Sequence, residues 1–146
     1  MSDLIGKYPV VLRQDLVWGD MDAFQHINNT VYFRYFENAR IAYFKKIGVI
    51  EYMQAHRIGP ILASTRCDFK APLTYPGSIQ IAASIKDIRA KRFTMAYVVY
   101  SENLASIAAS GEGLIVYYNY KKFKSCPIPE KIVNEIKRIE TGFAQA

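Results

Sequence analysis

The sequence has few residues of the kinds that build metal centres or disulfide frameworks. It holds two cysteines and two histidines in 146 residues. Cys67 and Cys126 show neither the CxxC nor the CxxH spacing of a metal site. We therefore expect no metal and no cofactor. Lone thiols, together with an N-terminus that lacks a charged-then-apolar signal region, also predict a reduced, cytoplasmic protein.

Other missing motifs exclude further classes of protein. The chain has no Gly-x-Ser-x-Gly elbow, which argues against the serine nucleophile of an α/β-hydrolase. It also has no glycine-rich phosphate loop. No apolar run approaches the roughly 18 residues that a membrane-spanning helix needs, so we expect a soluble protein without a membrane span.

The residues that are present are typical of a packed globular protein. Hydrophobic residues make up 51% of the chain and charged residues 22%, and 146 residues suit one domain, which we expect over residues 1–146. The net charge of +6 suggests a polyanionic partner such as nucleic acid, an anionic membrane surface or a phosphate-rich small molecule. The basic residues are scattered, which argues against nucleic acid.

The N-terminal part predicts one strand followed by one long helix. Apolar residues alternate over residues 10–18, which is the period of a half-buried strand. They then recur at helical spacing over residues 31–47, preceded by the N-cap candidates Asn28 and Asn29 and followed by Gly48 as a stop signal. This helix is apolar around much of its circumference, so it needs a sheet or a partner around it.

The remainder of the chain predicts an antiparallel meander. After a short helix near residues 51–56, the expected strands and closing helix cover residues 61–71, 78–89, 93–101, 105–120 and 132–139. The fold class is therefore α+β, with helices packed on an antiparallel sheet. Such a sheet leaves an open edge, which pairing with a second copy would cover, so we expect a homo-oligomer, either a dimer or a tetramer.

One loop carries a specific motif. Residues 18–29 read Trp-Gly-Asp-Met-Asp-Ala-Phe-Gln-His-Ile-Asn-Asn, and Tyr32, Glu37 and Arg40 follow in the expected helix. This pattern resembles the 4-hydroxybenzoyl-CoA thioesterase family, and within it the branch similar to long-chain acyl-CoA thioesterases. The benzoyl-CoA branch usually has Gly where this chain has Gln25. The resemblance implies the hotdog fold, in which a curved antiparallel sheet wraps one long helix.

The resemblance also implies a catalytic group. Asp22 corresponds to the catalytic carboxylate, which acts in this family either as a nucleophile or as a general base. The backbone N–H of Asn29 corresponds to the oxyanion donor, because the first amides of a helix are unpaired and lie at its positive end. His26 is a supporting candidate that orients a group or donates to it. The plain alternative for Asp22 is a loop cap, and Asp20 is interpreted as structural.

Four further residues are candidates for substrate contacts by their place in the family pattern: Asn28, Tyr32, Glu37 and Thr65. Asn28 is equally well explained as an N-cap. Glu37 could form an intrahelical ion pair with Arg40. Thr65 has core packing as its alternative.

The basic connection between two expected strands is the candidate coenzyme A site. Arg89, Lys91 and Arg92 lie there, and arginine pairs well with phosphate. An ordinary solvated turn is an equal alternative.

The resulting hypothesis is hydrolysis of an acyl-CoA thioester. Other activities on the same fold, such as an acyl carrier protein thioesterase or an enoyl hydratase, remain alternatives because fold does not determine reaction. A non-enzymatic acyl-CoA or lipid binder is a further alternative. Acyl length and aromatic or aliphatic preference are left open.

Overall fold

One antiparallel sheet forms the body of the protein. The computed structural model describes residues 3–141. The strands, in spatial order, are β1 (Val10–Asp15), β3 (Ser78–Lys86), β4 (Arg92–Ser101), β5 (Ser106–Asn119) and β2 (Ile58–Phe69), with β6 (Lys124–Ser125) beside β5. All neighbouring strands are antiparallel. The strands β1 and β2 are therefore the two edges of the sheet.

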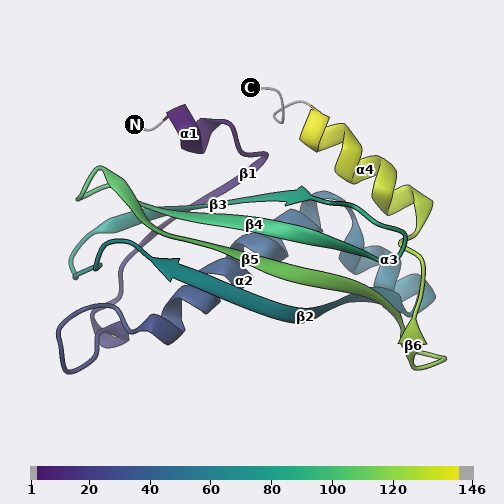
Figure 1. The fold of residues 1–146 in the computed structure, drawn as a ribbon, viewed down its shortest axis with the longest axis horizontal. Helices are drawn as coiled ribbons and strands as arrows, with labels where there is room; N and C mark the ends of the chain where they lie inside the picture. The colour runs from purple at the N-terminus through teal and green to yellow at the C-terminus, as the bar shows by residue number, and fades with distance from the viewer. Residues whose placement is uncertain (1–2, 142–146) are drawn as a thin grey trace.

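The long helix α2 (Asn29–Lys46) lies along one face of this curved sheet (Figure 1). Asn28 is its N-cap, and the Asn28 side-chain oxygen accepts the Thr30 N–H at 2.9 Å. After the helix, Gly48 has a φ of +80°, a conformation that glycine adopts without steric cost. The buried side chains of α2 are Tyr32, Tyr35, Phe36, Ala39, Tyr43 and Phe44. The predicted central helix is confirmed.

Shorter helices lie around the sheet. These are α1 (Asp3–Gly6), the 3-10 turn η1 (Trp18–Asp20), α3 (Val49–His56) and α4 (Glu130–Thr141). The helix α4 buries Ile132, Ile136 and Ile139, whereas α1 places Ile5 in a separate apolar cluster with Val98 and Tyr100. None of the helices within residues 3–141 is long and apolar enough to cross a membrane.

The first strand is shorter than predicted. Its pairing with β3 ends at Asp15, opposite Ser78. The Leu16 N–H then bonds to Gly77 O at 2.8 Å, and the chain leaves the sheet. Trp18, the last apolar residue of the strand predicted over residues 10–18, is 70% exposed, so that part of the prediction was wrong.

The strand β2 also departs from the regular alternation of a β-strand. A bulge lies between Leu62 and Ser64, so Ala63 is an extra residue in the ladder with β5. Residues on either side of a bulge change face. Ile61 and Thr65, which regular alternation along the strand predicted over residues 61–71 would place on one face, therefore lie on opposite faces. Most of β2 is exposed because one of its sides has no neighbouring strand. The remaining strands and the closing helix lie where the spacing predicts them.

Candidate active site

The Gly-Asp-x-Asp loop is a small hairpin. Met21 and Ile27 form an isolated antiparallel bridge, and the Asp22 N–H bonds to His26 O at 3.0 Å. Gln25 closes the turn with a φ of +63° and donates its N–H to Asp22 O. A left-handed residue at this point lets the chain reverse within a few residues, so a glycine would suit the position.

Backbone hydrogen bonds fix this hairpin to the protein. The Ile27 N–H bonds to Leu73 O at 2.8 Å, and the Asn28 N–H bonds to Asp20 O at 2.9 Å. Ile27 and Leu73 are both buried. The loop therefore enters α2 from a fixed direction.

Asp22 lies half-buried on this hairpin. One carboxylate oxygen accepts the Phe24 N–H at 2.9 Å, and the other has no hydrogen-bond partner among the residues that the structure describes. The side chain borders a hollow of about 370 Å³ that is lined by Trp18, Gly19, Met21, Asp22 and Gln25. A carboxylate with one oxygen oriented and one oxygen free is able to act as a base or a nucleophile.

The first turn of α2 holds a free amide at its start. The Thr30 N–H bonds to the Asn28 side chain and the Val31 N–H bonds to Asn28 O at 3.0 Å. The Asn29 N–H has no acceptor within residues 3–141. It therefore lies at the positive end of the helix as an available donor for a developing oxyanion.

Asn29 opens onto a second hollow of about 300 Å³. This groove is lined by His26, Ile27, Asn29, Tyr32, Phe69, Lys70, Ala71 and Pro72. The ring of Tyr32 meets the ring of Phe69 edge to face, with centroids 5.0 Å apart. Burial raises the pKa of Tyr32 to about 12, so its hydroxyl stays protonated.

The structure therefore brings Asn29, His26 and Tyr32 to one groove and places Asp22 on the neighbouring hollow. The backbone pair between Asp22 and His26 joins the two hollows. That Asp22 and the Asn29 N–H act on one carbonyl stays a prediction.

Two other candidates, Asn28 and Glu37, lie outside the two hollows. The side-chain oxygen of Asn28 is used for the N-cap, since both the N–H and the hydroxyl of Thr30 donate to it. Glu37 is exposed, and the expected ion pair with Arg40 was wrong. Arg40 instead donates to the hydroxyl of Tyr97 at 3.1 Å. A long-range partner has displaced the local one.

Thr65 lies exposed on β2, and its hydroxyl donates to Glu112 O at 3.2 Å, so the core-packing alternative was wrong. Its neighbour Cys67 is half-buried. Burial raises the pKa of the Cys67 thiol to about 11, which keeps it protonated and a poor nucleophile.

The basic connection lies far from Asp22 within one chain. β3 begins beside the end of β1 and therefore near the Asp22 loop. Its nine residues at about 3.3 Å each carry the chain roughly 30 Å away before Arg89, Lys91 and Arg92 follow. Among the described residues, no carboxylate lies within ion-pair distance of these three cations. Their assignment to coenzyme A stays a prediction.

Sequence reasoning missed two features of these surfaces. Trp18 forms one wall of the Asp22 hollow, and its position directly before the motif was the available signal. A turn with Lys121, Lys122 and Lys124 surrounds an exposed Phe123 at the same end as the basic connection. Within residues 3–141, no three His, Cys, Asp or Glu side chains are grouped as metal ligands.

Comparisons with known proteins concern the family and the fold of the chain. A family model for the thioesterase-like superfamily matches residues 16–136. A relative from Aquifex aeolicus (strain VF5), whose suggested activity is that of an esterase, is 26% identical over 131 residues, covering 88% of this chain and 98% of the relative. The long-chain acyl-CoA thioesterase FadM from Escherichia coli (strain K12) is 18% identical over 119 residues, covering 82% of this chain and 90% of FadM.

Solved structures share the fold. A thioesterase from Thermus thermophilus, complexed with coenzyme A and zinc, is 25% identical and has a TM-score of 0.80, covering 92% of this chain and 97% of its own. Together with the sheet wrapped on α2, this likeness confirms the hotdog fold that the motif implied.

Proposed function

We propose an activity that follows from one premise: the chain belongs to the thioesterase-like superfamily. The proposed activity is hydrolysis of an acyl-CoA to the free acid and CoA. One observation carries the proposal, namely that a rigid hairpin holds the free oxygen of Asp22 close in sequence to the unpaired Asn29 N–H. The named activity of FadM and the coenzyme A bound to the Thermus protein support the substrate class.

In the proposed mechanism, Asp22 acts in one of two ways. As a general base it takes a proton from water while the water oxygen attacks the carbonyl carbon. As a nucleophile its own oxygen attacks, and water then hydrolyses the acyl-enzyme anhydride. In both, the Asn29 N–H donates to the oxyanion, the carbon–sulfur bond breaks, and the CoA thiolate leaves and is protonated. His26 lies in the groove, where it supports the bound thioester.

The Asp22→Asn variant tests this proposal. It should remain folded and lose turnover by at least about a hundredfold, which is typical for a central acid–base or nucleophilic group. Thiol release from a panel of acyl-CoAs, with acyl carrier protein thioesters and enoyl-CoAs beside them, measures it. The matched control Asp20→Asn should keep most of the activity. Turnover like that of the wild type in Asp22→Asn would overturn the assignment.

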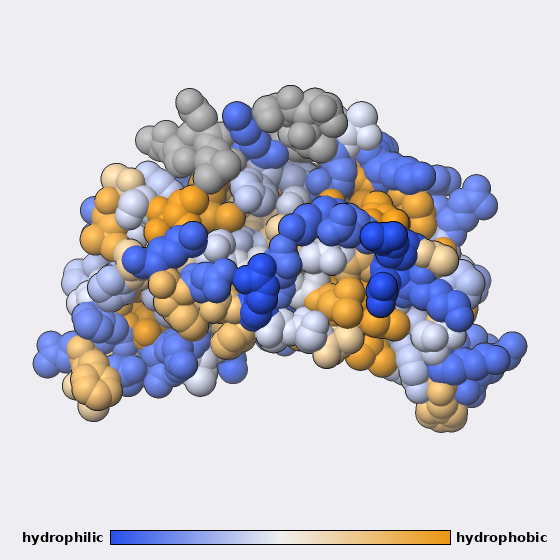
Figure 2. Space-filling view, in the orientation of Figure 1, coloured by the Kyte–Doolittle hydropathy of each residue, from blue (hydrophilic) through white to orange (hydrophobic). Residues whose placement is uncertain are grey.

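We also propose that two copies join along β2. This strand has twelve residues, lies at the edge of the sheet, and exposes Leu62 and half of Phe69. Figure 2 shows a hollowed lower rim between two projecting ends of the molecule, with apolar residues along part of it. Antiparallel pairing of two β2 strands would satisfy the open edge and cover this apolar surface.

Such pairing would complete the site from two chains. The Asp22 end of each copy carries the carboxylates of Asp20 and Asp22, whereas Asp68 there is paired with Arg66. Antiparallel copies would place the basic connection of one beside the Asp22 loop of the other. We therefore propose that Arg89, Lys91 and Arg92 of one copy hold the CoA phosphates of its partner's site.

The cytoplasm is the proposed location. Both cysteines are free thiols, which suits a reducing compartment. The proposed substrate, a coenzyme A thioester, is consistent with that placement.

A further inference from the structure

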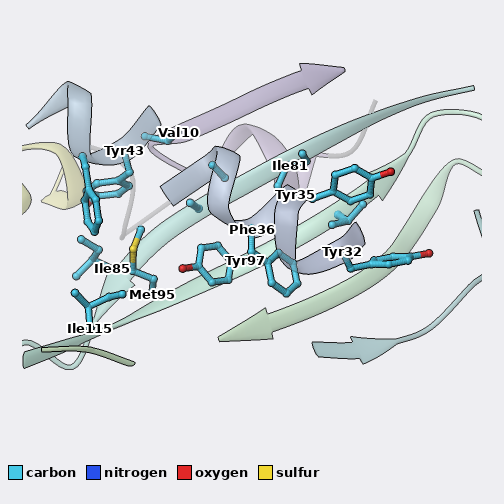
Figure 3. Close-up of a cluster of buried hydrophobic side chains, with 14 of the residues drawn as sticks. Val10, Tyr32, Tyr35, Phe36, Tyr43, Ile81, Ile85, Met95, Tyr97 and Ile115 are labelled. Carbon is cyan, nitrogen blue, oxygen red and sulfur yellow. The ribbon is translucent and has the colours of Figure 1, made fainter. Parts of the chain in front are cut away.

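An exposed phenylalanine lies in the hairpin that joins β5 to β6, at its tip (residues 121–124, the hairpin tip). Phe123 is 78% exposed, and within residues 3–141 its ring packs against no other aromatic ring. The rings of Phe36 and Tyr97, in contrast, stack on each other in the interior between α2 and the sheet (Figure 3). Burial of a phenylalanine ring favours folding, so packing within the chain does not account for Phe123.

The backbone conformation also disfavours a phenylalanine at this position. Phe123 has a φ of +55°, in the left-handed region where bulky side chains are rare and glycine or asparagine is preferred. Hydrogen bonds impose this conformation. The side-chain oxygen of Asn119 accepts the N–H groups of Lys121 and Lys122, both at 3.0 Å. The backbone oxygen of Asn119 accepts the Phe123 N–H at 2.8 Å. The chain therefore holds an exposed ring on a fixed turn.

Cations surround this ring. Lys121, Lys122 and Lys124 are exposed, and none of them lies within ion-pair distance of a carboxylate among the described residues. Arg57 adds a further exposed cation nearby, since its backbone oxygen accepts the Tyr120 N–H at 2.9 Å. The hairpin tip thus combines one apolar ring with uncompensated positive charge.

The shape and size of the hairpin tip favour a membrane surface as its partner. The hairpin projects beyond the ends of the neighbouring strands (Figure 1). A stable protein interface takes about 800 Å² from each partner, which is more than one turn of four residues provides. A lipid surface needs no matching shape, because lysines can lie near lipid phosphates while an aromatic ring enters the boundary between headgroups and acyl chains.

We propose that the hairpin tip docks this protein on anionic phospholipid membranes, with the Phe123 ring inserted and the three lysines facing lipid phosphates. This inference goes beyond the proposed hydrolysis and does not depend on it. The contact uses the end of β5, whereas the proposed pairing of two copies uses the edge strand β2. Because one ring and a few cations contribute, the binding is reversible and sensitive to salt.

Cosedimentation with lipid vesicles tests the proposal on the intact wild-type protein. Vesicles of phosphatidylcholine and phosphatidylglycerol should bind the protein at low salt. Vesicles of phosphatidylcholine alone should bind it at least about tenfold more weakly, because they carry no net charge. Added salt should weaken the binding to the mixed vesicles.

The variant Phe123→Asn removes the ring and keeps the turn. Asparagine adopts a positive φ more readily than phenylalanine, so the variant should have a Tm no lower than that of the wild type. Its affinity for the mixed vesicles should fall by at least about tenfold, because the inserted apolar surface is lost. The matched control is Phe24→Asn, which removes an 83% exposed ring from the Asp22 hairpin and should leave the affinity unchanged.

A second variant tests the charge. Replacing the three lysines of the hairpin tip by glutamine should remove the preference for anionic vesicles. The control makes the same change in net charge at three exposed lysines outside the tip, Lys7, Lys45 and Lys137. This control should keep the preference, because the proposal places the contact in the hairpin tip.

Several outcomes would overturn the proposal. One is a folded wild type that fails to bind the mixed vesicles at low salt, and another is equal vesicle affinity of the wild type and Phe123→Asn. A higher KM of Phe123→Asn for a water-soluble acyl-CoA without vesicles would assign the ring to the substrate instead. Binding to single-stranded DNA or acyl carrier protein that Phe123→Asn abolishes, without vesicle binding, would assign it to another macromolecule. The vesicle assay contains no thioester, so its failure would leave the proposed hydrolysis standing.

Discussion

Glu140 on α4 accepts a hydrogen bond from the hydroxyl of Tyr43, which is fully buried on α2. The same carboxylate oxygen accepts the Ile85 N–H at 2.8 Å. Ile85 lies two residues beyond Ala83, the last residue of β3 that pairs with β1. Glu140 thus supplies the acceptor for the Ile85 N–H that the short edge strand β1 does not supply. It also connects α4 to both α2 and β3.

This contact predicts a dependence of stability on pH. Burial raises the pKa of Glu140 above its ordinary value, against the two hydrogen bonds that lower it. Its contribution to the free energy of unfolding is therefore complete at pH values below the unfolded pKa and is lost as the pH rises through the folded pKa. The Glu140→Gln variant keeps an oxygen acceptor and cannot ionise. We expect the wild type to lose stability relative to this variant as the pH rises above about 4.3, the ordinary pKa of a glutamate.

Urea unfolding over a series of pH values below and above about 4.3 measures the difference. The control is Glu135→Gln on the same helix, where Arg138 lowers the pKa of Glu135. That control should show the opposite sign, with the wild type losing stability as the pH falls. Identical pH profiles for the wild type and Glu140→Gln would contradict the assignment.

Because Gln25 has a left-handed backbone conformation, we expect glycine at this position to cost little stability. A residue with a side chain loses about 1 kcal/mol in this conformation, while glycine loses more chain entropy on folding, so the two effects nearly cancel. Gln25→Gly should therefore be as stable as the wild type to within about 0.5 kcal/mol. Gln25→Val should lose about 1–2 kcal/mol, because a β-branched side chain resists a positive φ.

Thermal unfolding of both Gln25 variants checks this prediction. Ala23→Gly serves as the control, because Ala23 lies in the same turn and has no positive φ, so only the entropy loss applies. A Gln25→Gly variant that is less stable than Ala23→Gly would show that the backbone conformation costs nothing at Gln25.

The proposed shared site predicts complementation between two defective chains. One chain carries Asp22→Asn, and the other carries alanine at Arg89, Lys91 and Arg92, which should raise KM by about tenfold or more. In a mixed dimer one site holds both defects and the other holds none. A pure mixed dimer should therefore have about half the activity of the wild type, and an equal mixture of the two chains, in which about half of the dimers are mixed, about a quarter.

Mixtures of Asp22→Asn with wild type are measured in the same assay. They show how activity falls when a defective chain only dilutes the intact one. If each site took its carboxylate and its cations from one chain, every site in the mixed dimer would stay defective. A lack of recovery in dimers shown to be mixed by mass spectrometry would therefore reject the shared site.

Much of the fold could be predicted from the sequence because the local spacing of apolar residues agrees with their long-range packing. The apolar spacing of α2, with Asn28 before it and Gly48 after it, predicts the observed helix. Asn28 was also correctly considered as an N-cap from its residue type. Trp18 was misplaced because the alternation continues after β1 has lost its partner strand. The sequence pattern does not record where pairing stops.

Contacts between distant residues set the remainder of the site. Glu37 and Arg40 have ideal helical spacing for an ion pair, yet Arg40 bonds to Tyr97, which is 57 residues away. The packing of Phe36 directly against β5 depends on Gly111, where an added Cβ atom would lie 2.5 Å from a Phe36 ring carbon. Neither contact produces a periodic pattern in the sequence. Both become visible only when α2 is seen packed on the sheet.

The cations Arg89, Lys91 and Arg92, which have no carboxylate partner within residues 3–141, have a kinetic consequence. A cluster of uncompensated cations has a long-range field that steers anionic ligands before they touch it. An anionic thioester would arrive first at the cationic surface and then be delivered to the reacting groups. Added salt should therefore slow capture and leave the rate of the bound complex almost unchanged.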